Sequence, residues 1–138
     1  MEDLTILCTW LQKFPGFPPG TRLTADYTDG KPETTGIFPL GLEEIRRKQT
    51  ISGGIQVENR EKFALYRVSC GQQDSPENAR WLLQLQHWVQ QQCALGLVPV
   101  FGENQHILAE RGRLIQSRQA GTALYSVTIT VSYTINLR

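Results

Sequence analysis

The end of the chain, from Thr122 to Asn136, alternates strictly between apolar residues and polar or small ones. Side chains on a β-strand point to opposite faces with a period of two, so this spacing predicts a long strand with one buried face. The apolar positions of that face are Ala123, Tyr125, Val127, Ile129, Val131, Tyr133 and Ile135. A fold that accommodates this segment must contain a sheet with one side in the core.

Two other segments repeat their apolar residues at helical spacing. The first is predicted to run from about Asp3, which can serve as the N-cap, to Phe14. The second follows a predicted N-cap at Ser75, has Pro76 at its first position and ends before Gly96. Both helices carry an apolar stripe, so we expect each to pack against the sheet.

Shorter alternating runs predict further strands over residues 21–27, 62–70 and 107–117, with a turn at 119–121 before the last strand. The hairpin-like connections favour an α+β fold, with an antiparallel sheet of about four main strands and both helices on one face. Some parallel pairing within a mixed sheet stays open. A chain of 138 residues is long enough for one core and too short for two, so we expect a single domain over residues 1–138.

The segment from Lys31 to Arg60 does not resemble a core strand. In an extended chain Arg46 and Lys48 point to one side and Arg47 to the other, so neither face suits a core. We expect a projecting arm or long hairpin here, outside the main core. The candidate residues for a subunit or partner interface are Ile37, Phe38, Arg46, Arg47, Lys48, Ile51 and Ile55.

The basic run at residues 46–48 has two interpretations. Charges on a strand edge commonly discourage unwanted pairing, and a short charge run usually faces solvent. The alternative is contact with an acidic neighbour or with nucleic acid, helped by Arg111, Arg113 and Arg118, and such binding would depend steeply on salt. The net charge of +1 argues against a protein that binds nucleic acid through bulk charge.

The sequence offers little material for catalysis or for a metal site. His87, His106 and three scattered cysteines lack the close pairing that is typical of zinc ligands. Phosphate-binding loops and the nucleophile-elbow motif are absent from the sequence. Cys70 and Cys93 lie in apolar patterns, where a thiol stays protonated, although a strongly shifted pKa of Cys70 or His106 beside a cleft would favour a small enzyme. We therefore expect no catalytic residue, no cofactor and no metal.

The first residues and the cysteines favour a reducing compartment. Met1-Glu2-Asp3 is acidic rather than basic, so we expect no signal peptide, and apolar runs are too short to cross a bilayer. An odd number of widely spaced cysteines favours free thiols in a cytoplasm.

Four parts of the chain carry a resemblance to a known family. They are the first helix with Leu4, Leu7 and Leu11, the strand around Lys62-Phe63-Ala64-Leu65, the helix from Ala79-Arg80-Trp81-Leu82-Leu83 through Trp88-Val89, and the last strand from Ala123-Leu124-Tyr125 through Val131-Ser132-Tyr133. In their order and in their pattern of apolar and polar residues, these parts resemble the tail terminator, or minor capsid, proteins of long-tailed bacteriophages and prophages.

The resemblance implies a subunit that assembles as a ring, typically a hexamer, on the head-proximal end of the tail tube. There it stops tube polymerisation and presents a surface to the head connector. The implied partners are other copies of the chain, the tail tube protein and the head–tail connector protein, without membrane or specific nucleic acid. The implied location is the virion tail or neck, after synthesis in the cytoplasm of the bacterial host. An arm with no core of its own suits pairing with a neighbouring subunit.

Three alternatives to a tail terminator remain open at this point. One is another neck or tail-completion protein that binds the connector without terminating the tube. The others are a small nucleic-acid-binding α+β module and a small α+β enzyme.

Overall fold

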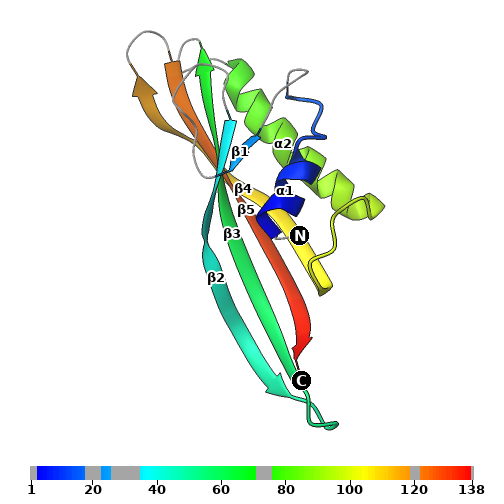
Figure 1. Ribbon diagram of the computed structural model, residues 1–138. Coiled ribbons are helices and arrows are strands. Elements are labelled where there is room, and N and C mark those ends of the chain that lie inside the picture. The colour runs from blue at the N-terminus through cyan, green and yellow to red at the C-terminus, as the bar shows by residue number, and fades with distance from the viewer. Residues whose placement is uncertain (1–2, 18–22, 26–34, 71–75, 119–121, 138) are drawn as a thin grey trace.

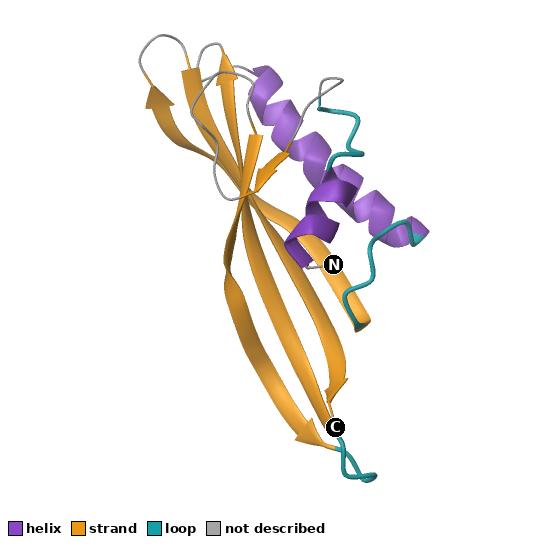
Figure 2. Cartoon of the chain, in the orientation of Figure 1, coloured by secondary structure: helices purple, strands orange, loops and turns teal. Residues whose placement is uncertain are grey.

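The computed structural model describes residues 3–17, 23–25, 35–70, 76–118 and 122–137, which form two helices and a sheet (Figure 1). In chain order the elements are α1 (Asp3–Leu11), β1 (Leu23–Ala25), β2 (Thr35–Gln49), β3 (Ile55–Cys70), α2 (Pro76–Leu95), β4 (Glu103–Arg118) and β5 (Thr122–Leu137). Both helices lie on one face of the sheet (Figure 2). The predicted α+β fold is confirmed.

The strands lie in the order β1-β2-β3-β5-β4. All four long strands pair antiparallel, whereas the short β1 runs parallel to the first residues of β2. The central pair, β3 and β5, stays in register from Ile55 opposite Leu137 to Cys70 opposite Thr122. This is the antiparallel sheet of about four main strands that the sequence predicts, with one parallel pairing at its margin.

The core lies between the sheet and the helices. Leu85 and Val89 of α2 are 0% and 1% exposed, and Leu7 and Leu11 of α1 are both at 0%. Complete burial of one such side chain contributes about 1.5–3 kcal/mol. On β5 the buried apolar residues all lie on the predicted face: Tyr125, Val127, Ile129, Val131 and Tyr133. Ile135 of that face is half-buried, and Ser126 and Thr130 of the other face are also buried.

Aromatic side chains join the two helices. The rings of Trp10 in α1 and Trp88 in α2 have centroids 5.1 Å apart, and Phe14 lies 5.6 Å from Trp88. Each indole N–H of the buried tryptophans has an acceptor: Trp10 donates to the carbonyl of Leu97 at 3.0 Å, and Trp81 donates to that of Gly16 at 3.1 Å. Because a buried indole N–H needs a partner, these bonds fix the helices relative to the connecting segments.

The end of α2 is the one that its sequence predicts. Gly96 has a φ of +73°, a conformation that glycine adopts without steric cost. Its amide donates to the carbonyl of Cys93 at 3.2 Å, and the amide of Leu97 donates to that of Gln92 at 2.9 Å. This pair of bonds is a Schellman motif. The N-cap predicted at Ser75 lies outside the described residues.

The first helix is shorter than predicted. It ends at Leu11, and the following amides of Lys13 and Phe14 donate to carbonyls three residues back, at Trp10 and Leu11. These are the bonds of a 3₁₀ turn, which ends the helix because Pro15 follows and cannot continue it. The strand predicted over residues 21–27 is described only over Leu23–Ala25, and the turn predicted at 119–121 lies outside the described residues.

The expected arm over residues 31–60 is not confirmed as a hairpin separate from the main sheet. Residues 31–34 lie outside the described part, and the rest forms β2 and the first third of β3. Within β3, Val57 is 3% exposed and pairs with Ile135 of β5. The long alternation of β5 requires a partner strand along its whole length, and residues 55–60 supply it. The distal half of the sheet therefore extends beyond the helices (Figure 1).

Candidate functional site

The outer edge of β2 is exposed over most of its length. In the described part of the chain, β1 covers only Thr35–Ile37 of this edge. From Phe38 to Gln49 every residue is exposed, although the strand is fully paired with β3 on its inner side apart from two irregularities. We call residues 38–49 the free edge. A row of unpaired backbone groups is a template for another strand.

Large apolar side chains lie along the free edge. Phe38, Leu40, Leu42 and Ile45 are 45%, 52%, 62% and 37% exposed. Single exposed apolar residues are common on protein surfaces, but a group of them on one edge is typical of a surface that another molecule covers.

Two bulges shape the free edge. The register with β3 shifts between Pro39 and Gly41 and again between Glu44 and Arg46. Gly41 has a φ of +141°, which disfavours other residues. Proline is tolerated on an edge strand because it has no N–H to leave unpaired there. The bulges bend the strand and change which side chains share a face.

The charged residues of the free edge are divided between the two faces of the sheet. Arg46 and Lys48 pair opposite Glu58 and Gln56. Arg47 is the neighbour of both and therefore points to the other face, as the sequence predicts. On that face its Nη2 lies 2.7 Å from Oε1 of Glu44, and both side chains are about half exposed. Such an exposed pair contributes little to stability.

The hairpin tip presents Ile51 to solvent, fully exposed. Below it, the amide of Thr50 donates to the carbonyl of Gly54 at 2.8 Å, and the amide of Gly54 donates to Oγ1 of Thr50 at 3.0 Å. These bonds hold the turn in one conformation, so the exposure of Ile51 is a property of an ordered tip.

The structure brings most of the predicted interface residues together on the free edge and its tip: Phe38, Arg46, Arg47, Lys48 and Ile51. It places the other two elsewhere. Ile37 is 0% exposed beneath the helices, and Ile55 is half-buried opposite Leu137.

Sequence reasoning missed Leu40, Leu42, Ile45 and the acidic residues Glu43 and Glu44 as members of the same edge. The sequence pattern that could have identified them is the mixture of apolar and charged residues in one extended segment. A strand with one buried face shows regular alternation instead.

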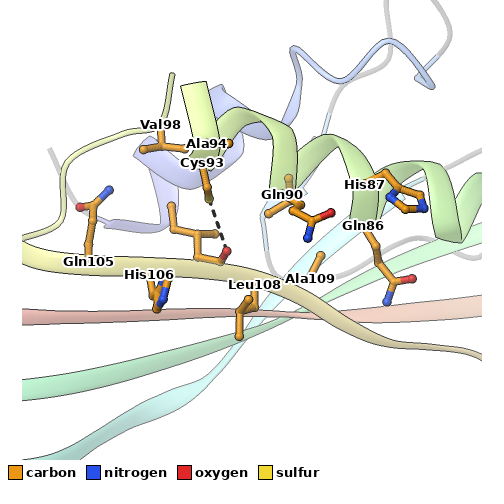
Figure 3. Close-up of a pocket in the computed structure, with 12 residues that line it drawn as sticks. Gln86, His87, Gln90, Cys93, Ala94, Val98, Gln105, His106, Leu108 and Ala109 are labelled. Carbon is orange, nitrogen blue, oxygen red and sulfur yellow. Dashed lines mark hydrogen bonds between the residues drawn. The ribbon is translucent and has the colours of Figure 1, made fainter. Parts of the chain in front are cut away.

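The opposite edge of the sheet is β4, and a groove of 690 Å³ separates part of it from α2 (Figure 3). Its lining includes Val89 and Cys93 from α2 and Ile107 from β4. On the β4 side, Leu108 is 51% exposed. The groove therefore combines an apolar floor with the margin of an edge strand.

The groove does not assemble a cysteine–histidine pair. The Cys93 thiol donates to the carbonyl of Ile107 at 3.4 Å, and burial raises the thiol pKa more than this bond lowers it. Figure 3 shows the His106 side chain on the opposite side of β4 from Cys93, and His87 near the other end of the groove on α2. A protonated thiol is a poor nucleophile. The side chain of Cys70 lies outside the described residues.

One carboxyl group on the helix-facing side of the sheet has a strongly shifted pKa. Partial burial of Glu61, together with its hydrogen bond and charge interaction with Asp3 of α1, raises its pKa to about 7, against a weaker opposing effect of Tyr133. The hydroxyl of Tyr133 donates to Oε1 of Glu61, and burial and this carboxyl raise the pKa of Tyr133. These side chains connect α1 to β3 and β5 rather than lining the groove.

Among the described residues, groups of three or more His, Cys, Asp or Glu side chains suited to a metal ion are absent. In the same part of the chain, the helices are too short or too polar to cross a membrane. Comparison with protein-family models gives no match to this sequence, and neither does comparison with curated proteins.

Proposed function

We propose that this protein is a structural subunit that docks edge to edge with copies of itself. In the role that the sequence resemblance implies, the copies form a ring that closes the head-proximal end of a bacteriophage tail tube and joins it to the head connector. The observation that carries the proposal is the free edge of β2, which exposes four large apolar side chains beside backbone that pairs with no further described strand. A second copy would cover both.

The strand directions support head-to-tail docking. Each step from β2 through β3 and β5 to β4 is antiparallel, so the two outer strands run in opposite directions. A neighbouring copy in the same orientation therefore brings its β2 antiparallel to β4. Such a heterologous contact closes into a ring when the rotation between copies divides a full turn. A net charge of +1 per copy keeps repulsion within a ring small.

The groove beside β4 supports the same arrangement. Following the register across the sheet, Leu42 of β2 is level with Glu61, Val131 and finally Ile107 of β4. A neighbour that docks without a shift thus brings its exposed Leu42 beside Ile107, at the groove under α2. Within a single copy the helices do not cover Leu42, which is 62% exposed. The tube protein and the connector are proposed as partners on the basis of the sequence resemblance alone.

Sedimentation velocity and negative-stain microscopy over a range of concentrations test the proposal. We expect ring-shaped particles for the wild-type protein at high concentration or with purified tail tubes, and their loss in Leu42→Lys, which places a charge in the contact. Leu97→Lys is the matched control, because Leu97 is 59% exposed, lies in neither β2 nor β4 and does not line the groove.

A wild-type protein that forms no ring up to about 1 mM, alone or with purified tail tubes, would contradict the proposal, since it implies docking weaker than about 4 kcal/mol. Equal effects of the two substitutions would also count against the free edge as the contact.

A further inference from the structure

The charges of the free edge follow one another in an order that complements itself. Two acidic residues, Glu43 and Glu44, precede Ile45, and three basic residues, at 46–48, follow it. Charges that only block an edge are effective when they have one sign, because they then repel every copy of the same strand. A strand that is acidic in its first half and basic in its second repels a parallel copy and attracts an antiparallel one.

The bulge determines which of these charges share a face. Glu44 and Arg47 pair opposite Asn59 and Val57, two odd-numbered positions of β3, and both therefore point to the helix-bearing face. The ion pair between them agrees with this placement.

The remaining charges of the free edge lie on the other face of the sheet. Glu43, Arg46 and Lys48 pair opposite Arg60, Glu58 and Gln56 of β3, which are even-numbered positions. Without the bulge, Glu44 and Arg47 would point to opposite faces.

We propose that two copies of the chain pair antiparallel through the free edge, about a two-fold axis between Ile45 and Arg46. In this register Glu44 lies opposite Arg47 of the partner subunit on the helix-bearing face. On the other face Glu43 lies opposite Lys48 of the partner subunit. The two-fold axis repeats each pair, so every directly opposed charge pair within residues 43–48 is attractive and on a shared face.

One apolar contact fits the same register, whereas Leu42 and Ile45 lie opposite Gln49 and Arg46 of the partner subunit. Continued outward from the axis, the register brings the exposed Leu40 level with Ile51 of the partner subunit, at the hairpin tip. A shift by one residue would place Glu44 opposite Arg46 of the partner subunit, whose side chain points to the other face. The arrangement of faces therefore disfavours a shift by one residue, and the proposed register is the one that pairs both Glu43 and Glu44 with basic residues on a shared face.

The two-fold pair and the head-to-tail ring both use the free edge. The β2 strand of one copy therefore cannot take part in both at the same time. The pair is accordingly the state of free copies, and it protects the free edge from open-ended strand addition until β4 of a neighbour replaces the partner. The inference depends on the geometry of β2 and not on the ring, so each can fail without the other.

Charge-swapped variants of the full chain test the pairing. The first, Glu43→Lys with Glu44→Lys, makes the edge basic throughout. The second, Arg46→Glu with Arg47→Glu and Lys48→Glu, makes it acidic throughout. All five side chains are exposed, so the fold is expected to persist, which circular dichroism checks.

We expect wild-type dimers whose dissociation constant rises with salt. Each variant alone should dissociate at least about tenfold more readily, because attractive cross-strand pairs become repulsive. An equimolar mixture of the two variants should form heterodimers, and a third variant with all five substitutions should regain homodimers, because its charge order is reversed but still self-complementary. Glu103→Lys on β4 is the control and should leave the dimer unchanged.

Analytical ultracentrifugation with one variant fluorescently labelled separates the outcomes. Failure of the mixture to form heterodimers would overturn the pairing, as would a wild-type protein that is monomeric up to about 1 mM. Rings that form while the charge swaps have no effect on association would overturn the pairing and leave the proposed function supported.

Discussion

Replacing Glu61 by Gln should reduce the loss of stability that accompanies a rise from about pH 5 to about pH 8. In the folded protein the pKa of Glu61 is raised from 4.5 to about 7, chiefly by burial and then by Asp3. Between these two values the folded state holds a proton that the unfolded state has lost. Stability is therefore fully present below the unfolded pKa and falls as the pH rises through about 7.

The size of the effect follows from the same two values. At 1.36 kcal/mol per pKa unit, a rise from 4.5 to about 7 corresponds to about 3.4 kcal/mol for a fully buried group. Glu61 is only partly buried, so solvent screening reduces this to about 1 kcal/mol. A glutamine keeps the acceptor for the Tyr133 hydroxyl and supplies a donor for Asp3 without titrating.

Urea denaturation at about pH 5 and about pH 8 measures the difference for the wild type and for Glu61→Gln. Glu58→Gln is the control, because Glu58 lies on the same strand and points to the opposite face. A wild-type protein that is equally or more stable at the higher pH, or a Glu61→Gln variant with an unchanged slope, would refute the reasoning.

Three further predictions concern the core and the thiols. Leu85→Ala should lower the free energy of unfolding by about 2–5 kcal/mol in urea titrations, because Leu85 is 0% exposed and its loss leaves a cavity. Trp10→Phe should cost about 1 kcal/mol beyond the change in packing, because it leaves the carbonyl of Leu97 without its indole donor. Burial raises the thiol pKa of Cys8 and of Cys93, so both should react slowly with iodoacetamide near neutral pH until the protein is denatured; rapid reaction of the native protein would contradict this.

The elements with a strong hydrophobic period were predictable from the sequence. The alternation along residues 122–136 predicted β5 and its buried face, and the end of α2 followed from Gly96. In both cases the signal is local: side-chain period in the first, backbone conformation in the second.

The arrangement of β2 was not predictable in the same way. Ile37 and Phe38 are adjacent and similarly apolar, yet one is 0% and the other 45% exposed. Which of them is covered depends on which face of the strand packs against the helices. Bulges disturb the alternation of the sequence, so the alternation does not predict that face. The segment 55–60 resembled an arm because its charges lie on the outer face, whereas its burial depends on pairing with the distant β5.

Amide hydrogen exchange of β2 at increasing protein concentration tests most directly whether copies dock through the sheet edge. Amides of residues 38–49 that do not bond to β3 point away from the sheet and should exchange quickly in dilute protein. They should become protected as the concentration rises, while the amides of Phe63–Leu65, paired on both sides, stay protected throughout. Outward amides that exchange equally fast at every concentration up to about 1 mM would contradict docking through this edge.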